Sequence, residues 1–411
     1  MRTCLKNIST LVTVESPLMR RSGNQMQDIG VIKNADVVIN NDIIEFAGTS
    51  ELNTNSDYDV IIDCSNKTVV PGFVDSHTHI VFSGERSGEL VKRLKGVTYM
   101  QIAEEGGGIK STMMSVRKTS KQEILQKAKM LALSSFKYGT TTIEIKSGYG
   151  LDYINEIKLL EVISDLKLET PQTIVATFLG AHDIPPEYSI NRTGYINEIT
   201  EQMLPEISKR NLATFCDVFS DNGYFTTNEA RQIFLAAKQY GLQLKLHADE
   251  LSSFGGAELA SEVGAISADH LLRISNEGIL SMLNNNVVAT LLPGTAFFLG
   301  LDYAPARKMI SEGLCVALGS DCNPGSNMCE NLQMTMALAT MGMKMTIEET
   351  ICAVTINGAA ALGLADKIGS IEVGKNADML IFNCEDYPEI VYHYGINMIS
   401  GIVKNGVFYK N

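Results

Sequence analysis

The chain has 411 residues, of which 45% are hydrophobic and 20% charged, and this composition is that of a globular protein without low-complexity tracts. Because one hydrophobic core rarely holds so many residues, we expect one large domain and a smaller one. The net charge of −13 disfavours a nucleic-acid partner, because a polyanion would be repelled.

The N-terminal segment MRTCLKNISTLVTVESP has no apolar stretch followed by a small-residue cleavage site, so it does not resemble a signal peptide. The longest nearly apolar run, residues 287–301, is too short to span a bilayer and is interrupted by Pro293 and Gly294. The eight cysteines are scattered without a CxxC pair, as is usual for reduced thiols. We therefore expect a cytoplasmic protein that does not enter membranes.

Short alternating strands with Asn, Gly and Asp at their turns are predicted near both ends of the chain, over residues 29–70 and 369–411. Each of these segments contains the tetrapeptide Lys-Asn-Ala-Asp before an apolar strand, which we interpret as related turn chemistry. We expect the two ends to meet in one small β-sandwich domain, formed by residues 1–70 and 365–411.

Between residues 70 and 325, eight short apolar or β-branched runs alternate with segments of helical character. In order they are GFVDSHTH, TTTIEIKSGYG, TIVATFLGAHD, TFCDVFSD, LQLKLHADE, AISADHLL, VVATLLPG and CVALGSDCNPGS. Strands buried on both faces and separated by helices indicate parallel pairing with right-handed crossovers. Eight such units predict a (β/α)₈ TIM barrel over residues 71–364 rather than a doubly wound sheet.

The first crossover of this barrel, residues 80–136, is unusually long and contains Glu104-Glu105-Gly106-Gly107-Gly108. A long loop at this position is expected to border the active site. The stretch GGGIKS within it is not a phosphate-binding P-loop, because Ile109 stands where a glycine must precede the lysine.

The chain has only six histidines, and five of them fall at or just after the carboxyl ends of predicted barrel strands: His77, His79, His182, His247 and His270. Reacting groups of (β/α)₈ enzymes come from these strand ends and the loops that follow, so the placement indicates an active site. The sixth, His393, shares no strand end with the others, and we interpret it as a structural residue.

The pattern His77-Thr78-His79 places two imidazoles on the same face of an extended strand, where both can bind one ion. His247 follows the fifth strand and Asp321 follows the eighth. Three imidazoles and a carboxylate suit one divalent ion such as zinc or iron, with a position left open for water.

Many barrel hydrolases hold two ions bridged by a carboxylated lysine after the fourth strand. Here the fourth strand, residues 214–219, is followed by Ser220 and Asp221 and no lysine, which favours a single ion per subunit. Lys146 ends the second strand, and we interpret it as a structural or ion-pairing lysine because that position is not next to the proposed ligands.

Together, the motifs PGFVDSHTHIVFSGER, EEGGGIKSTM, IEIKSGYGL, TFLGAHDIPPEY, KLHADEL, SADHLL, LLPGTAFFLG, GSDCNPGS and GSIEVGKNADMLIF resemble the imidazolonepropionase family over nearly the whole chain. HTH, HADE and GSD alone indicate only the amidohydrolase superfamily, whereas GERSGEL, KSGYGL, GAHDIPPEY and DCNPGS carry the narrower resemblance. Two mild departures are Phe219-Ser220-Asp221, where a Cys-Glu pair is expected, and Ser326, where Thr is also common.

The resemblance implies hydrolysis of the lactam ring of 4-imidazolone-5-propanoate to N-formimidoyl-L-glutamate. It also implies that the metal ligands are His77, His79, His247 and Asp321. The substrate contacts that it implies are Arg86, Tyr149, His182, Glu250, Asn323, Gly325 and Ser326, with His270 beside the reacting carbonyl.

Catalytic roles follow from the chemistry of these side chains. Asp321 can accept a proton from the attacking water, and Glu250 can hydrogen-bond the ring nitrogen or relay that proton. His270 can donate to the developing oxyanion. The guanidinium of Arg86 matches the propionate bidentately, although a surface ion pair with Glu85 or Glu89 is the alternative.

Two other functions are compatible with part of this pattern. A nucleobase deaminase of the same fold uses the same HxH, His and Asp set, but Arg86 with the GAHD and NPGS loops favours a substrate with a flexible carboxylate. A non-catalytic scaffold is the alternative from another class, and the presence of all four ligands speaks against it. We further expect a homodimer.

Overall fold

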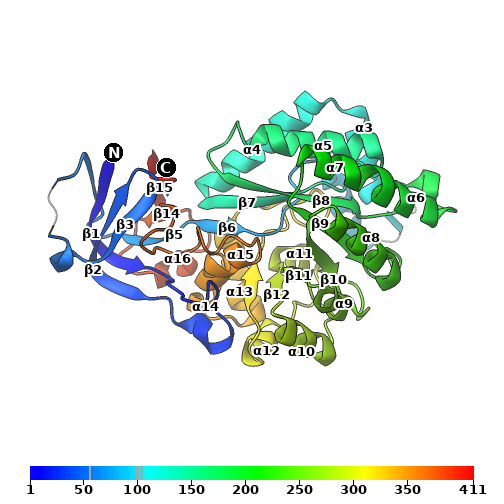
Figure 1. Ribbon diagram of the computed structural model, residues 1–411. Coiled ribbons are helices and arrows are strands. Elements are labelled where there is room, and N and C mark those ends of the chain that lie inside the picture. Colours follow the sequence, from blue (N-terminus) through cyan, green and yellow to red (C-terminus); the bar gives the residue numbers. More distant parts are fainter. Residues whose placement is uncertain (55–56, 98–100, 103–104) are drawn as a thin grey trace.

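The computed structural model describes residues 1–54, 57–97, 101–102 and 105–411. Figure 1 shows two parts side by side, a small sheet that holds both termini and a larger barrel surrounded by helices. Glu104, in the segment expected to border the active site, lies outside the described residues.

Eight parallel strands form the barrel, and each pairs with the next in chain order. They are β6 (Phe73–Asp75), β7 (Thr140–Lys146), β8 (Thr173–Ala181), β9 (Phe215–Ser220), β10 (Gln243–Ala248), β11 (Ser267–His270), β12 (Val288–Leu291) and β13 (Val316–Leu318). Backbone hydrogen bonds just beyond β6 and β13 close the ring, from Asp321 N to His77 O (2.9 Å) and from His79 N to Cys322 O (3.0 Å). The predicted (β/α)₈ barrel is confirmed.

Helices pack around the barrel strands (Figure 1). In chain order they are α1 (Ser87–Leu94), α3 (Ile109–Lys118), α4 (Lys121–Lys137), α5 (Tyr153–Leu166), α6 (Arg192–Glu198), α7 (Leu204–Arg210), α8 (Thr227–Gln239), α9 (Gly256–Glu262), α10 (Asn276–Asn285), α11 (Pro293–Leu299), α12 (Ala306–Ser311), α13 (Leu332–Met343), α14 (Ile347–Ala353) and α15 (Ile356–Ala360). Capping boxes fix where several of them begin, for example Ser120 with Glu123 at α4 and Thr226 with Glu229 at α8. Among the described residues, no helix is both long and apolar enough to cross a membrane.

The two chain ends form the second sheet. Its strands are β1 (Arg2–Val12), β2 (Val31–Asn40), β3 (Ile43–Thr49), β4 (Val60–Asp63), β5 (Thr68–Pro71), β14 (Met379–Phe382), β15 (Ile399–Lys404) and β16 (Val407–Lys410), with α16 (Pro388–Tyr392) between β14 and β15. The order is β16-β15-β14-β5-β1-β2-β3, and β4 also pairs with β1. Hydrogen bonds join Ile44 and Asp42 to residues 374–377, so this single sheet bends back on itself to enclose a core, as a sandwich does.

The central strand β1 is not among the strands that the sequence predicts. Its register with β2 shifts between Leu5 and Ile8, where Asn7 has a φ of 60°. A bulge of this kind breaks the period-2 alternation by which a strand is recognised in a sequence.

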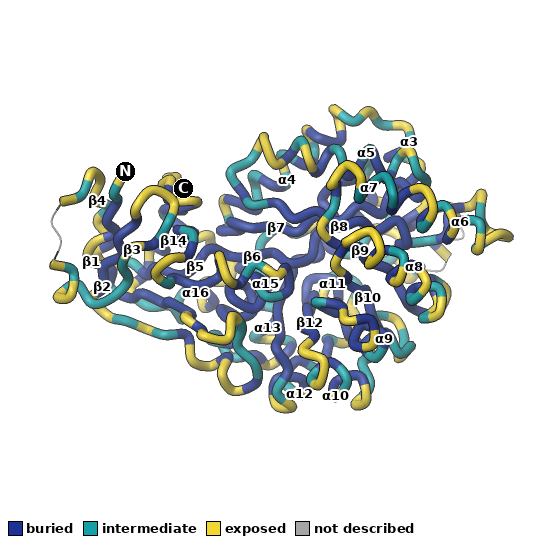
Figure 2. The backbone as a smooth tube through the Cα atoms, viewed as in Figure 1, coloured by how far each residue is buried: buried dark blue, intermediate teal, exposed yellow. Residues whose placement is uncertain are grey.

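Strand β14 separates two hydrophobic cores by alternation of its side chains. Met379 and Ile381 point into the core of the terminal sheet, whereas Leu380 and Phe382 join the core of the barrel. Figure 2 shows that burial is continuous from this sheet into the barrel strands. The sheet is therefore packed against the barrel, and the carboxyl ends of the barrel strands remain open for a site.

Candidate metal centre

The five strand-end histidines gather at the carboxyl ends of the barrel strands, and each is 7% exposed or less. They lie in or under a pocket of about 520 Å³. Predicted site residues that line this pocket are His79, Arg86, Tyr149, His182, His247, Glu250, His270, Asp321, Asn323, Gly325 and Ser326. His77 lies fully buried beneath it. His393 is exposed at the end of α16 and takes no part in the pocket.

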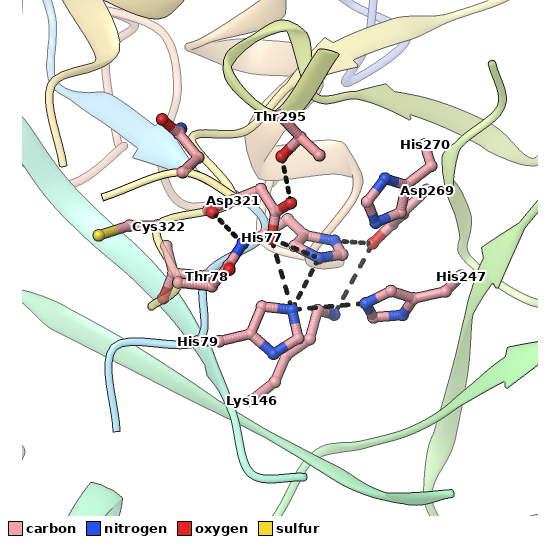
Figure 3. Close-up of polar contacts among 12 residues, drawn as sticks. His77, Thr78, His79, Lys146, His247, Asp269, His270, Thr295, Asp321 and Cys322 are labelled. Atoms are coloured by element: carbon pink, nitrogen blue, oxygen red, sulfur yellow. Dashed lines mark hydrogen bonds and ion pairs between the residues drawn. The ribbon is translucent and has the colours of Figure 1, made fainter. Parts of the chain in front are cut away.

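The imidazoles of His77, His79 and His247 point their Nε2 atoms toward one another (Figure 3). His79 Nε2 lies 3.2 Å from His77 Nε2 and 3.4 Å from His247 Nε2. Asp321 Oδ1 lies 3.6 Å from His77 Nε2 and 3.5 Å from His79 Nε2. Donors at 2.0–2.1 Å around a tetrahedral zinc ion are about 3.4 Å apart, so these four residues fit a divalent ion.

The protonation of these histidines also suits metal binding. Burial holds the pKa of His77 and of His79 well below the usual range, so both imidazoles are neutral and carry a lone pair. Thr78, between them, faces the opposite way and donates its hydroxyl to Glu144 O at 2.7 Å. The alternation expected for the HTH pattern is therefore present.

Two aspartates behind the histidines face their Nδ1 atoms, and the sequence analysis assigned neither of them a role. Asp269 Oδ2 accepts a hydrogen bond from His77 Nδ1 at 2.6 Å, and Asp217 Oδ2 lies 2.9 Å from His247 Nδ1. The hydrogen bond from His77 Nδ1 to Asp269 keeps the proton on Nδ1 and leaves Nε2 of His77 for the metal, and the charge of Asp217 favours the same arrangement in His247. The available signal is a charged residue inside an apolar barrel strand, as in TFCDVFSD and AISADHLL.

Lys146 lies at the same level of the barrel. Its Nζ is 2.7 Å from Glu144 Oε1 and 2.8 Å from Asp217 Oδ2, so the ion-pairing interpretation is confirmed. The reason given for that interpretation is wrong, because a single carboxylate separates Lys146 from His247. Side chains that point into a barrel converge, however far apart they are in the sequence.

Asp321 and Glu250 are buried carboxyl groups near the proposed ligand atoms. Asp321 accepts a hydrogen bond from the Thr295 hydroxyl at 2.5 Å, and burial raises its pKa to about 6. Burial, and then the neighbouring charge of Asp321, raises the pKa of Glu250 to about 8. His270 Nε2 lies 3.6 Å from Glu250 Oε2. His270 thus faces the pocket from beside the cluster of converging nitrogens (Figure 3).

Residues 219–221, which differ from the Cys-Glu pair expected from the family resemblance, contact the surroundings of Glu250. Phe219 lines the pocket and packs on Tyr224, with ring centroids 4.0 Å apart. Asp221 accepts hydrogen bonds from Leu251 N (2.8 Å) and from the Ser252 hydroxyl (2.6 Å). It therefore fastens the loop that carries Glu250.

Arg86 lies at the pocket wall and is 8% exposed. Its Nε and Nη2 donate to Glu89 Oε2 at 3.1 and 2.9 Å, so the alternative ion pair with Glu89 exists, although it is buried rather than on the surface. A Cβ on Gly325 would come within 2.4 Å of Arg86 Nη1. Glycine at this position lets the backbone lie against the guanidinium.

The remaining predicted contacts form two further walls of the pocket. Asn323 Oδ1 accepts hydrogen bonds from the backbone N–H groups of Gly325 and Ser326, both at 2.8 Å, and so shapes the NPGS loop. His182 Nδ1 lies 2.9 Å from Gly148 O, and its ring stacks on that of His79 with centroids 5.3 Å apart. The Tyr149 ring lies 5.3 Å from that of His182.

Comparison with known proteins adds a family to this geometry. The model of the amidohydrolase family matches residues 68–409. The imidazolonepropionase of Porphyromonas gingivalis is 47% identical over 100% of this chain and 98% of its own length, and that of Alkaliphilus oremlandii is 46% identical over 98% and 96%.

Solved structures of lower identity share the fold. A zinc-bound adenosine deaminase from Xanthomonas campestris has a TM-score of 0.72 at 15% identity, covering 99% of this chain and 92% of its own. A zinc complex of atrazine chlorohydrolase from Arthrobacter aurescens has a TM-score of 0.71 at 15% identity, covering 99% and 94%.

Proposed function

Because the chain belongs to the amidohydrolase family and, within it, to the imidazolonepropionases, we propose that it hydrolyses the lactam ring of 4-imidazolone-5-propanoate. The product is N-formimidoyl-L-glutamate, an intermediate of histidine degradation. The observation that carries this proposal is the convergence of three imidazole nitrogens and one carboxylate oxygen beneath a pocket whose wall contains a buried arginine.

His77, His79, His247 and Asp321 would hold one divalent ion, zinc or iron, in each subunit. Such an ion, when bound, lowers the pKa of a coordinated water to about 7 and polarises the amide carbonyl. A single ion is favoured because the fourth barrel strand, β9, ends at Ser220 and is followed by Asp221 and no lysine, while the ammonium of Lys146 is engaged with Glu144 and Asp217.

Three side chains manage protons during the reaction. The carboxylate of Asp321, oriented by Thr295, takes the proton from the attacking water. Glu250 is protonated at neutral pH, because its pKa is about 8, and it donates to the ring nitrogen that leaves. His270 donates to the oxygen of the opening amide, where negative charge develops.

Substrate binding rests on the opposite wall of the pocket. Arg86 binds the propionate, and this requires its fork to turn from Glu89 or to share it. His182 and Tyr149 cover the ring from the side of β7 and β8, and Asn323, Gly325 and Ser326 cover it from the loop after β13.

The alternative of a nucleobase deaminase has less support. The adenosine deaminase named above shares only 15% identity with this chain, a similarity that extends to the fold alone. A buried arginine in the pocket favours an anionic substrate over a neutral base.

A direct assay tests the proposal. The purified protein is incubated with 4-imidazolone-5-propanoate, and N-formimidoyl-L-glutamate is identified by mass spectrometry; guanine and cytosine are tested in parallel for ammonia release. We expect turnover only of the imidazolone. Ammonia release from a base, without ring opening of the imidazolone, would establish the deaminase instead.

Zinc and iron are distinguished by stripping the protein with a chelator and adding each ion back. We expect activity to be lost on stripping and to return with at least one of the two ions. The predicted homodimer is tested separately by light scattering of the same protein.

A further inference from the structure

Lys146 lies inside the barrel with its side chain fully buried, below the histidines that converge in the pocket. Three carboxylates surround its ammonium. Glu144 Oε1 lies 2.7 Å from Nζ, Asp217 Oδ2 lies 2.8 Å from it and Asp269 Oδ2 lies 3.7 Å from it. The ammonium donates hydrogen bonds to Glu144 and Asp217, whereas Asp269 lies at ion-pair distance. A second buried lysine, Lys245, places its Nζ 3.5 Å from the same Asp269 oxygen.

Two of these carboxylates lead directly to the metal site. Asp217 Oδ2, which faces Lys146, is also the atom that lies 2.9 Å from His247 Nδ1. Asp269 Oδ2 faces Lys146 at 3.7 Å and accepts the hydrogen bond from His77 Nδ1 at 2.6 Å. One ammonium is therefore linked, through one carboxylate oxygen in each case, to two of the three imidazoles.

The position of these carboxylates decides the direction of the imidazoles. Asp217 also accepts the backbone N–H of His247 at 3.1 Å, which ties the ring and the backbone of this residue to the same group. Carboxylates that lie together in a barrel interior repel one another unless a cation lies between them. Without the ammonium of Lys146, Asp217 would lose the cation that faces it at 2.8 Å, and Asp269 would keep, of its two lysines, only Lys245 at 3.5 Å. The direction of the His247 imidazole would then be lost first, and that of His77 less completely.

We propose that Lys146 is a positioning residue of the metal centre, which fixes the orientation of His247 through Asp217 and shares with Lys245 the positioning of His77 through Asp269. The inference rests on the proposed metal-dependent function. It assigns to the end of the second strand a role in metal affinity, although Lys146 is not itself a ligand.

Lys404 provides a matched control elsewhere in the fold. Its side chain is also buried, and its Nζ lies 2.7 Å from Asp378 Oδ2 and 2.8 Å from the Thr173 hydroxyl. Neither partner is within the metal cluster. Lys404→Met therefore removes the same kind of buried ammonium without touching the histidines.

The experiment measures the Zn²⁺ affinity of the stripped protein by competition with a chromogenic chelator, and thermal unfolding of the same samples without metal. Lys146→Met should weaken Zn²⁺ binding about 10–100-fold, as loss of a partner behind the ligands does elsewhere. Lys404→Met should lower the melting temperature and leave the Zn²⁺ affinity within about twofold of the unchanged protein. Lys146→Gln, which keeps a donor, should lie between, and it serves if the Met variant does not fold.

Two further readouts separate positioning from a general structural role. The visible spectrum of the Co²⁺-loaded protein should change in Lys146→Met and not in Lys404→Met, because it reports the geometry of the ligands. In a double-mutant cycle, Lys146→Met and Asp217→Asn should lose less affinity together than the product of their separate losses, because they act in one chain of contacts.

An unchanged Zn²⁺ affinity and Co²⁺ spectrum in Lys146→Met or Lys146→Gln would overturn the inference, and so would an equal loss in Lys404→Met. Since substrate is absent from these measurements, they do not depend on which lactam is hydrolysed. Failure of the unchanged protein to bind Zn²⁺ or Co²⁺ would instead contradict the proposed metal site itself.

Discussion

The barrel and the terminal sheet both bury lysine–carboxylate pairs, but the contacts of these pairs end in different places. In the sheet, Lys404 reaches Asp378 and the Thr173 hydroxyl at the start of β8, and the other oxygen of Asp378 accepts the backbone N–H of Asn405 at 2.9 Å. None of these contacts leads to a histidine of the metal cluster. In the barrel, Lys146 contacts Asp217, and Asp217 contacts Nδ1 of His247. The other ring nitrogen of His247, Nε2, faces His77 and His79 in the metal cluster. A buried lysine–carboxylate pair is therefore not by itself a sign of a functional site. The pair in the barrel differs because its carboxylate contacts a proposed metal ligand.

The strongest test of this difference removes one converging imidazole. His77→Ala should lower turnover and metal affinity together by at least about 100-fold, because it removes one of the four converging donors and leaves the buried Asp269 without its imidazole partner. Turnover and metal content by atomic emission are measured together. His393→Ala, at an exposed histidine far from the pocket, should change neither. Full metal content and normal turnover in His77→Ala would show that the buried charges of the barrel, like those of the terminal sheet, do not support a metal site.

The next largest effect is expected at His270, which lies beside the ligands rather than among them. His270→Ala should lower kcat about 10²–10³-fold and leave the metal in place, as removal of one oxyanion donor does elsewhere. Steady-state kinetics and metal content should therefore separate in this variant, whereas in His77→Ala they fall together. Loss of metal from His270→Ala would make this residue a ligand.

The raised pKa of Glu250 predicts that kcat/KM depends on pH, and changes in the terminal sheet should not alter this dependence. With a pKa of about 8, its carboxyl group donates a hydrogen bond below pH 8 and cannot do so above it. We expect kcat/KM to fall about tenfold per pH unit above that value, which profiles between pH 6.5 and 9.5 would show. In Glu250→Gln the amide keeps a hydrogen-bond donor but has no proton to transfer, so turnover should fall and the remaining activity should lack this alkaline limb. Its persistence in the variant would assign the limb to another group.

Arg86 should contribute to binding more than to chemistry. Arg86→Lys keeps the charge and loses the fork, so KM should rise about tenfold, the value of one charge-assisted hydrogen bond, with kcat nearly unchanged. Glu89→Gln offers the matched comparison, because it frees the guanidinium from its partner and should not raise KM. An unchanged KM in Arg86→Lys would leave the ion pair with Glu89 as the role of this arginine.

The smallest effect on turnover is expected from the core of the terminal sheet. Ile381→Ala, at a side chain 1% exposed, should lower the free energy of unfolding by about 2–5 kcal/mol. Both kcat and KM should remain within about twofold, because its neighbours lie in the core away from the barrel. Urea unfolding and kinetics on the same preparation check this. A large fall in kcat would show that the sheet supports the site as well as the fold.

The barrel could be predicted from the sequence because its strands are short apolar or β-branched runs, most of them followed by polar residues. Strand ends with residues such as His247 and Asp321 converge in any closed barrel, so the pocket residues were accessible from the pattern too. The sequence pattern did not predict which buried charged side chains pair with one another inside the barrel. The contacts of Asp217 and Asp269 with Lys146 and the imidazoles join different strands across the barrel, and the sequence does not show which strands face each other. For the same reason, the sequence analysis placed Lys146 too far from the proposed ligands.

Two other features could not be derived from pattern. Strand β1 is hidden by the irregular register at Asn7, where apolar and polar residues stop alternating. An ion pair of Arg86 with Glu85 or Glu89 was named from the sequence as an alternative, but the choice of Glu89 depends on how the first crossover folds.

The antiparallel pairing of β5 with β14 sets an order for assembly during synthesis. Pro71 pairs with Met379, so about 300 residues emerge between the two partners, which takes about 15–60 s at 5–20 residues per second. Strands β6 to β13 and Asp321 are complete well before that, so the barrel can close while one edge of β5 still lacks its neighbour. An unpaired strand edge is a template for aggregation. The nascent chain should therefore depend most on chaperones after its catalytic half has folded, and truncation before residue 379 should yield an insoluble protein with all four metal ligands present.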